Sequence, residues 1–156
     1  NTMKNKILTV SLMSFLIILS CNDKKSKDIG SNTIKKVNDS ISSKLLYENA
    51  ITKNVGKYPH EINLFDNVEV SKRLKKIVGS KYKEIIENFN TETPIVSENT
   101  IYKVTGCKQH ECPLFHTTIL FDAEKDNFNV VVDNNGKSEE FIEKEKINLS
   151  QSLKDK

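Results

Sequence analysis

The second half of the chain alternates short runs of β-branched and aromatic residues with turn residues, and this pattern constrains the fold most strongly. The clearest turn is Asn135-Gly136, a pair that favours the tight turn of a β-hairpin. A longer polar segment, 122–127, separates two of the preceding runs. We therefore predict an antiparallel meander with strands at 101–104, 117–121, 128–132 and 140–142.

The residues before the predicted strands have the spacing of amphipathic helices. Asn67 can cap a helix that ends before Gly79, and the apolar residues between them recur every three or four positions. A second helix is predicted from Ser80, again as the capping residue, to Phe89, and a segment that contains a proline ends it. Helices followed by an antiparallel meander indicate an α+β fold, with two helices packed on one face of the sheet.

Residues 1–20 have the layout of a bacterial lipoprotein signal peptide. Two lysines precede an apolar run of about 13 residues, which suits a secretory signal and is shorter than the roughly 20 residues of a membrane-spanning helix. The run ends at Leu19-Ser20-Cys21, which resembles a lipobox. This resemblance implies cleavage before Cys21 and its diacylation, with palmitate as a typical acyl group. The alternative is an ordinary cleaved signal followed by an incidental cysteine.

The remaining chain divides into a tether, one domain and a tail. Residues 21–53 are mostly polar and bury too little surface to fold alone, so they are predicted to be a tether. The apolar spacing at 34–48 also fits a short helix, which leaves the tether's end open. Residues 54–149 suffice for one hydrophobic core, and residues 150–156 are predicted to be a polar tail.

The chain has three cysteines, and the assignment of Cys21 to lipid leaves Cys107 and Cys112 as a pair. An exported protein reaches an oxidising compartment, where two close cysteines form a disulfide. A loop this short stabilises the fold by roughly 2 kcal/mol in the chain-entropy model. The bridge is therefore expected mainly to fix the shape of the four polar residues inside it, although a plain stapled turn is the simpler alternative.

The charges are unevenly distributed along the chain, whose net charge is +3. Segment 71–83 holds six basic residues and no acidic one, and is interpreted as the exposed face of the first helix. Segment 84–145 holds thirteen acidic and five basic residues, a net of −8. An acidic domain attracts cationic partners and repels nucleic acid, although an ordinary solvated surface is the simpler interpretation.

Few residues suit catalysis or metal binding. The histidines are His60, His110 and His116, and the sequence has no glycine-rich phosphate loop. Cys107 and Cys112 lack the spacing of a redox motif, and His110 has no evident nucleophile or orienting partner. We therefore expect no enzyme activity and no cofactor, and we expect His60 and His116 to be structural. A metal site made by the two cysteines with His110 and His116 stays open as an alternative.

Residues 107–112, Cys-Lys-Gln-His-Glu-Cys, lie between two predicted strands and resemble the Cys-Lys-Pro-His-Asp-Cys loop of the inhibitor of vertebrate lysozyme family. The resemblance implies a small α+β domain whose disulfide-closed loop enters the active-site cleft of lysozyme, where its histidine hydrogen-bonds the catalytic carboxylates. Carried over to this chain, the bridge falls on Cys107 and Cys112, and the inserting histidine is His110.

Two loop positions differ from the family pattern. Lys108 matches the family lysine, whereas Gln109 replaces the proline, which loosens the loop, and Glu111 is one methylene longer than the aspartate. The likeness extends over roughly 57–142. The part 57–79 also resembles a related group of exported proteins with a Gly-Cys-x-x-His-x-Cys loop.

The sequence thus predicts a lipid-anchored inhibitor of lysozyme in the bacterial cell envelope, on the outer membrane facing the periplasm. Its partner would be a protein, a c-type lysozyme or another peptidoglycan hydrolase, bound by Lys108, Gln109, His110 and Glu111. One alternative is an immunity protein whose loop blocks a peptidoglycan-degrading toxin from another cell. The other alternative is a metal-binding lipoprotein.

Overall fold

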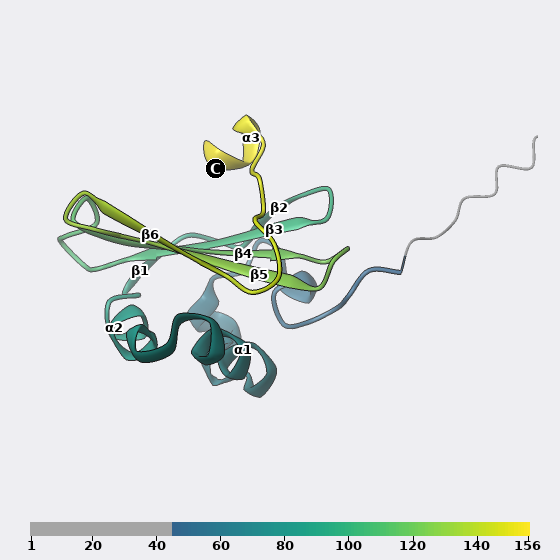
Figure 1. The fold of residues 1–156 in the computed structure, drawn as a ribbon, viewed down its shortest axis with the longest axis horizontal. Helices are drawn as coiled ribbons and strands as arrows, with labels where there is room; N and C mark the ends of the chain where they lie inside the picture. Colours follow the sequence, from purple (N-terminus) through teal and green to yellow (C-terminus); the bar gives the residue numbers. More distant parts are fainter. Residues whose placement is uncertain (1–44) are drawn as a thin grey trace, which may run out of the picture. The chain divides into compact units, whose positions relative to one another are not determined.

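An antiparallel sheet forms the centre of the structure (Figure 1). The computed structural model describes residues 45–156, so the predicted signal peptide, Cys21 and most of the tether lie outside the described residues. Within them, the strands are β1 (Thr91–Glu92), β2 (Val96–Glu98), β3 (Ile101–Cys107), β4 (Phe115–Asp122), β5 (Asn127–Asn134) and β6 (Lys137–Ile142). The α-helices are α1 (Val68–Val78), α2 (Tyr82–Glu87) and α3 (Gln151–Lys154). Short 3-10 helices span Thr52–Asn54, Pro59–Ile62, Leu64–Asp66 and Gly79–Lys81.

Strands β3 to β6 pair in chain order, each antiparallel to the next, so the predicted meander and the α+β fold are confirmed. Each strand is longer than predicted: β3 continues to Cys107 and β4 begins at Phe115. Strands β1 and β2 both pair with the other edge of β3 and were not predicted. They are two and three residues long, which is too short to show an alternating pattern.

Helix α1 begins and ends as predicted. The Asn67 side chain accepts a hydrogen bond from the Val70 amide at 3.1 Å, and Gly79 follows the helix with a φ of 57°. The prediction that Ser80 caps α2 is wrong. Ser80 lies inside the 3-10 turn Gly79–Lys81, so its backbone is already helical, whereas a capping residue needs extended backbone to turn its side chain toward free amides.

The hydrophobic core lies between the sheet and the first two helices. Both α1 and α2 cover the same face of the sheet, and α3 lies on the opposite face (Figure 1). The helices contribute Val70, Leu74, Val78 and Ile85, and the sheet contributes Val104, Ile119, Phe121, Phe128 and Val130. The turns that join the strands therefore lie at the two ends of the sheet, at the edge of the core, where loops can protrude.

The packed core extends beyond the predicted limits of 54–149 at both ends. Ile51 and Leu153 are 0% and 1% exposed. Leu153 lies in α3, which begins with Ser150 as its capping residue and packs on the back of the sheet. The buried Lys103 side chain donates hydrogen bonds to the carbonyl oxygens of Leu153 and Lys154, at 3.0 and 3.3 Å. A single anchoring leucine in so short a helix leaves no periodic signal in the sequence.

One residue of the basic segment is not on the exposed face that the sequence predicted. Arg73 points from α1 to the sheet, where its guanidinium donates hydrogen bonds to Glu143 at 2.6 and 3.0 Å and lies 4.6 Å from the centre of the Phe128 ring. Burial opposes the charge of Glu143, but the bonds from Arg73 and from the Phe128 amide outweigh it and lower the pKa of Glu143. Arg73 therefore joins helix and sheet through a partly buried ion pair.

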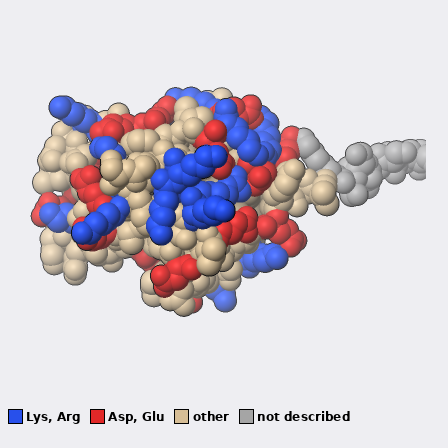
Figure 2. Space-filling view, turned by 60° about the horizontal axis from the view of Figure 1, so that its bottom comes forward, with Lys and Arg blue, Asp and Glu red and all other residues tan. Residues whose placement is uncertain are grey.

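The contrast between basic and acidic segments is consequently weaker in space than along the chain. Lys81 also reaches the β half, with its ammonium 2.7 Å from the Glu139 carboxylate. Lys72, Lys75 and Lys76 remain exposed on α1, as predicted. Figure 2, in which the helix side is turned forward, shows Lys and Arg gathered near the middle of this face with acidic residues around them.

Candidate functional site

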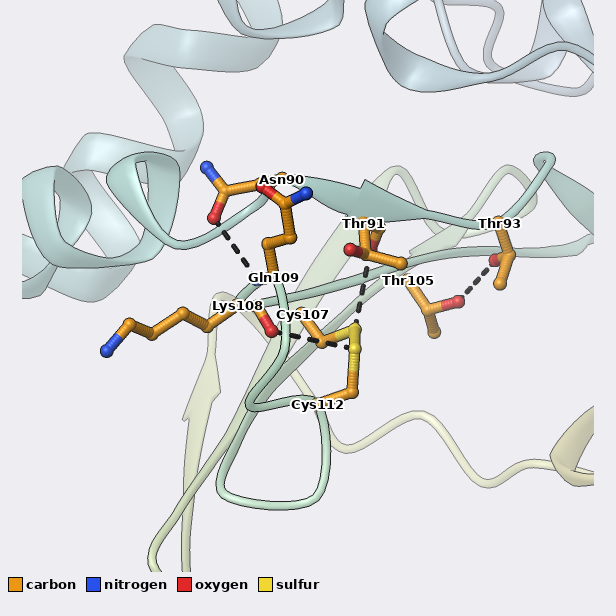
Figure 3. Close-up of a disulfide and its surroundings, with 8 residues drawn as sticks. All are labelled: Asn90, Thr91, Thr93, Thr105, Cys107, Lys108, Gln109 and Cys112. Carbon is orange, nitrogen blue, oxygen red and sulfur yellow. Dashed lines mark hydrogen bonds between the residues drawn. A yellow bond between two sulfur atoms is a disulfide. The ribbon is translucent and has the colours of Figure 1, made fainter.

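The predicted loop connects β3 to β4 at one end of the sheet. Cys107 and Cys112 form a disulfide with a Cα–Cα distance of 4.8 Å, which confirms the predicted pairing (Figure 3). Cys107 is the last residue of β3 and lies opposite His116 of β4, so the loop leaves the sheet directly from a paired position. The β5–β6 hairpin lies at the same end and supports the loop, because the Asn135 amide donates to the Leu114 carbonyl at 2.7 Å.

Backbone hydrogen bonds fold the loop into consecutive tight turns. The Glu111 amide donates to the Lys108 carbonyl at 2.9 Å, and the amides of Leu114 and Phe115 both donate to the Glu111 carbonyl, at 2.8 and 2.9 Å. The Lys108 amide closes the base by donating to the Phe115 carbonyl at 3.1 Å. The loop shape is thus set by main-chain bonds as well as by the disulfide.

Gln109 gains a contact that a proline would not make. Its amide lies 3.4 Å from the side-chain oxygen of Asn90, just after α2, and donates a long hydrogen bond to it (Figure 3). Proline has no N–H, so this link from the loop to the helix is available only because the family proline is absent. The sequence suggested that Gln109 loosens the loop; the bond to Asn90 offsets part of that effect.

His110 is the exposed tip of the loop. Its φ is 65°, in the left-handed region that non-glycine residues seldom adopt, and the tight turn around it imposes this conformation. Within residues 45–156 its side chain has no hydrogen-bond or ion-pair partner, and it is exposed to solvent. Both ring nitrogens are therefore free to bond a ligand.

The two charged residues of the loop bind each other. The Lys108 ammonium lies 2.8 and 2.9 Å from the two carboxylate oxygens of Glu111, and both side chains are a little under half exposed. Their charges cancel at short range, so the pair adds no net charge beside His110. Among the loop's four inner residues, His110 and Gln109 are left as the polar side chains without an internal ion pair.

The base of the loop is packed tightly against the helix layer. Gly106, one residue before the disulfide, lies under the ring of Phe89, and a Cβ atom at this position would come within 2.3 Å of the ring. Phe89 packs edge-on against Phe65, with ring centres 4.9 Å apart. The disulfide sulfur of Cys107 also lies 3.5 Å from the Thr91 carbonyl of β1 (Figure 3). This packing holds the starting point of the loop in place.

The other two histidines each lie next to a carboxylate. His60 Nδ1 is 2.8 Å from a Glu92 oxygen that also accepts the His60 amide, and this pairing ties the Pro59–Ile62 turn to β1. His116 Nδ1 lies 4.0 Å from Asp133 on the neighbouring strand. Burial lowers the pKa of His116; Asp133 opposes this shift and the charge of Lys103 assists it. Both contacts link neighbouring parts of the fold, as a structural role requires.

The described part of the chain offers no evident metal centre. Residues 45–156 contain no cluster of three or more His, Cys, Asp or Glu side chains arranged to hold an ion. The proposed ligands Cys107 and Cys112 are joined to each other, and an oxidised pair does not supply thiolates. Within the same residues, no helix is long and apolar enough to cross a membrane.

Comparison with known proteins identifies one family. The family model for the inhibitor of vertebrate lysozyme (Ivy) matches residues 69–156, more than half of the chain. The match begins at the first turn of α1 and includes the whole sheet and the loop. No curated protein and no solved structure gives a significant match. The family consists of inhibitors rather than enzymes, and its members act on a protein, lysozyme. This chain therefore belongs to the inhibitor of vertebrate lysozyme family.

Proposed function

We propose that this chain inhibits lysozyme by inserting the loop between Cys107 and Cys112 into the active-site cleft, with His110 as the residue that meets the catalytic groups. One observation carries the proposal: an exposed histidine without an internal partner stands at the tip of a disulfide-closed loop, in a member of a lysozyme inhibitor family. The loop protrudes from an end of the sheet, so a concave partner can surround it (Figure 1).

The chemistry of a glycosidase cleft suits an imidazole. Such a cleft holds two carboxyl groups, of which one is protonated and the other ionised in the resting enzyme. A neutral imidazole has one N–H donor and one acceptor nitrogen, so His110 can donate to the carboxylate and accept from the carboxylic acid. Binding in this way would occupy both catalytic groups and exclude the substrate.

The fixed shape of the loop favours tight binding. A flexible loop loses conformational entropy when it is ordered in a complex, and this loss weakens association. Here the disulfide, the turns around Glu111 and the contact of Asn90 with Gln109 already restrict the loop before binding. The Lys108–Glu111 ion pair further means that no unpaired loop charge must lose its water in the cleft.

The proposal includes a lipid anchor on Cys21 and a position in the periplasm, on the outer membrane. Cys21 lies outside the described residues, so the support for the anchor comes from the sequence. The Tyr47 amide donates to the Ala123 carbonyl at 2.7 Å, in the β4–β5 turn, which is at the end of the sheet opposite the loop. The described chain thus begins at the end of the sheet opposite the loop.

The inhibition is tested with a c-type lysozyme and a soluble peptidoglycan substrate. Competitive inhibition is expected, because loop and substrate occupy the same cleft; inhibition that is unaffected by substrate concentration would contradict insertion. Parallel assays with g-type and i-type lysozymes and a bacterial amidase test the immunity-protein alternative. That alternative predicts inhibition of the amidase or of another bacterial hydrolase. Incorporation of labelled palmitate, and its loss in Cys21→Ser, tests the anchor.

A further inference from the structure

A polar hollow of about 180 Å³ lies directly beside the loop. Three separate parts of the chain form it: Glu84 comes from α2, Glu111 and Leu114 come from the loop, and Asn134 comes from the end of β5. Glu111 lies inside the disulfide loop and Leu114 follows it before β4, so a protein that surrounds the loop also reaches the hollow. The hollow is therefore part of the surface that a bound lysozyme would touch.

One carboxylate that lines the hollow is not part of an ion pair in the part of the chain that the structure describes. Glu111 is neutralised by Lys108 at 2.8 Å, whereas Glu84 has no ion pair within the described residues. The ammonium of Lys81 is bonded to Glu139 at 2.7 Å, and the charges of Glu139 and Glu84 both raise the pKa of Lys81, so Lys81 is engaged mainly by Glu139. The Glu84 side chain has a single long hydrogen bond, 3.4 Å from the Asn134 amide. Glu84 is exposed to solvent, and because Lys108 is paired with Glu111 the hollow keeps a net negative charge.

One of the exposed side chains that line this mostly polar hollow is apolar. Leu114, which follows the disulfide loop, is 49% exposed and lines the hollow. A lysine or arginine side chain combines a charged head with an apolar stem, and such side chains place the stem on apolar surface while the head meets a carboxylate. Leu114 and Glu84, which both line the hollow, offer this combination of apolar surface and carboxylate.

We propose that the hollow receives a basic side chain of the bound lysozyme and that Glu84 is the residue that selects it. This inference rests on the proposed function, because the loop must first bring the partner to this end of the sheet. It adds to the loop a second contact, on α2, with a different chemistry: an ion pair in place of the hydrogen bonds of His110. Lysozymes with a basic residue at the edge of the cleft would then be inhibited more strongly than those without one.

The test compares Glu84→Gln with Glu87→Gln in the mature protein. Both changes remove one negative charge from α2 and keep the side-chain size. Glu87 is exposed, pairs with Lys83 at 3.6 Å and does not line the hollow, so it controls for the general charge of the domain. The dissociation constant for a cationic c-type lysozyme is measured at about 0.05 M and about 0.5 M salt. Thermal unfolding verifies that both variants remain folded.

For Glu84→Gln we expect the dissociation constant to rise about five- to tenfold at low salt, with a much smaller difference at high salt. For Glu87→Gln we expect a change below about twofold, and Glu84→Lys should weaken binding more than Glu84→Gln. An unchanged constant for Glu84→Gln, or an equal rise for both glutamine variants, would overturn the role of the hollow. If His110→Ala still weakens binding in that case, the proposed function stands; if the wild type binds no lysozyme, both fail.

Discussion

Gly106→Ala gives the sharpest test of the packing that holds the loop. An alanine at a position whose backbone conformation it can adopt ordinarily stabilises a protein relative to glycine, by about 0.4–1 kcal/mol, because it reduces the freedom of the unfolded chain. Gly106 does not have a positive φ, so its backbone would accept an alanine. Without a steric obstacle, the substitution should therefore raise stability slightly.

The Phe89 ring reverses that expectation. The added Cβ would lie 2.3, 2.4 and 2.6 Å from three ring carbons, all well inside van der Waals contact. Phe89 is 6% exposed and packs on Phe65, so its ring cannot turn away into solvent. Overpacking of this kind costs about 1–3 kcal/mol. We expect Gly106→Ala to lower the free energy of unfolding by about this amount, and to weaken lysozyme inhibition because Cys107 is the next residue.

A double-mutant cycle with Phe89→Leu identifies the cause. The smaller leucine should relieve the clash, so the loss in the double variant should be less than the sum of the two single losses by at least about 0.5 kcal/mol, measured by denaturant unfolding. A Gly106→Ala variant that is as stable as the wild type would refute the reasoning, and so would strictly additive losses. In either case the loop base would not depend on the contact between Gly106 and Phe89.

Two further predictions concern the residues that hold the domain and the loop together. Replacing Cys107 and Cys112 by alanine should lower the free energy of unfolding, measured with urea, by roughly 2 kcal/mol. The same variant should inhibit lysozyme less strongly. Full inhibition by the variant would argue against a disulfide-dependent loop. Arg73→Met should lower the free energy of unfolding by about 2–3 kcal/mol, because the Glu143 and Asp126 carboxylates lose their partner while they remain partly buried. The folded state lowers the pKa of Glu143, so ionised Glu143 stabilises the fold at neutral pH. This stabilisation is lost as the pH falls below about 4.5, the ordinary pKa of the group. The free energy of unfolding, measured against pH, should therefore fall in acid for the wild type and fall less for Arg73→Met.

Local patterns in the sequence were sufficient to predict the main elements of the fold. Asn67 and Gly79 mark the two ends of α1, and Asn135-Gly136 marks the β5–β6 turn, because capping and tight turns depend on a few adjacent residues. Ser80 shows where such rules fail: a 3-10 turn joins the two helices and moves the start of α2. The short strands β1 and β2 exist because they pair with the edge of β3, a long-range contact without a local signal.

The candidate site could be predicted only in part. The disulfide followed from the number of cysteines and the expected compartment, and the histidine from the likeness of the loop to one family. The positive φ of His110 and the bond from Gln109 to Asn90 depend on how the loop closes and on the position of α2. The hollow at Glu84 requires three parts of the chain to meet, so no pattern within any one of them indicates it.

The most direct measurement of the proposed mechanism is the inhibition constant of His110→Ala against a c-type lysozyme, with Asn99→Ala as the matched control. Asn99 is also exposed and also has a positive φ, 55°, but it lies in the β2–β3 turn at the other end of the sheet. Both variants thus place an alanine in the same strained backbone conformation. We predict that His110→Ala raises the inhibition constant at least about tenfold, as expected for a central contact residue, and that Asn99→Ala leaves it unchanged. An unchanged constant for His110→Ala would contradict insertion of the loop into the active site.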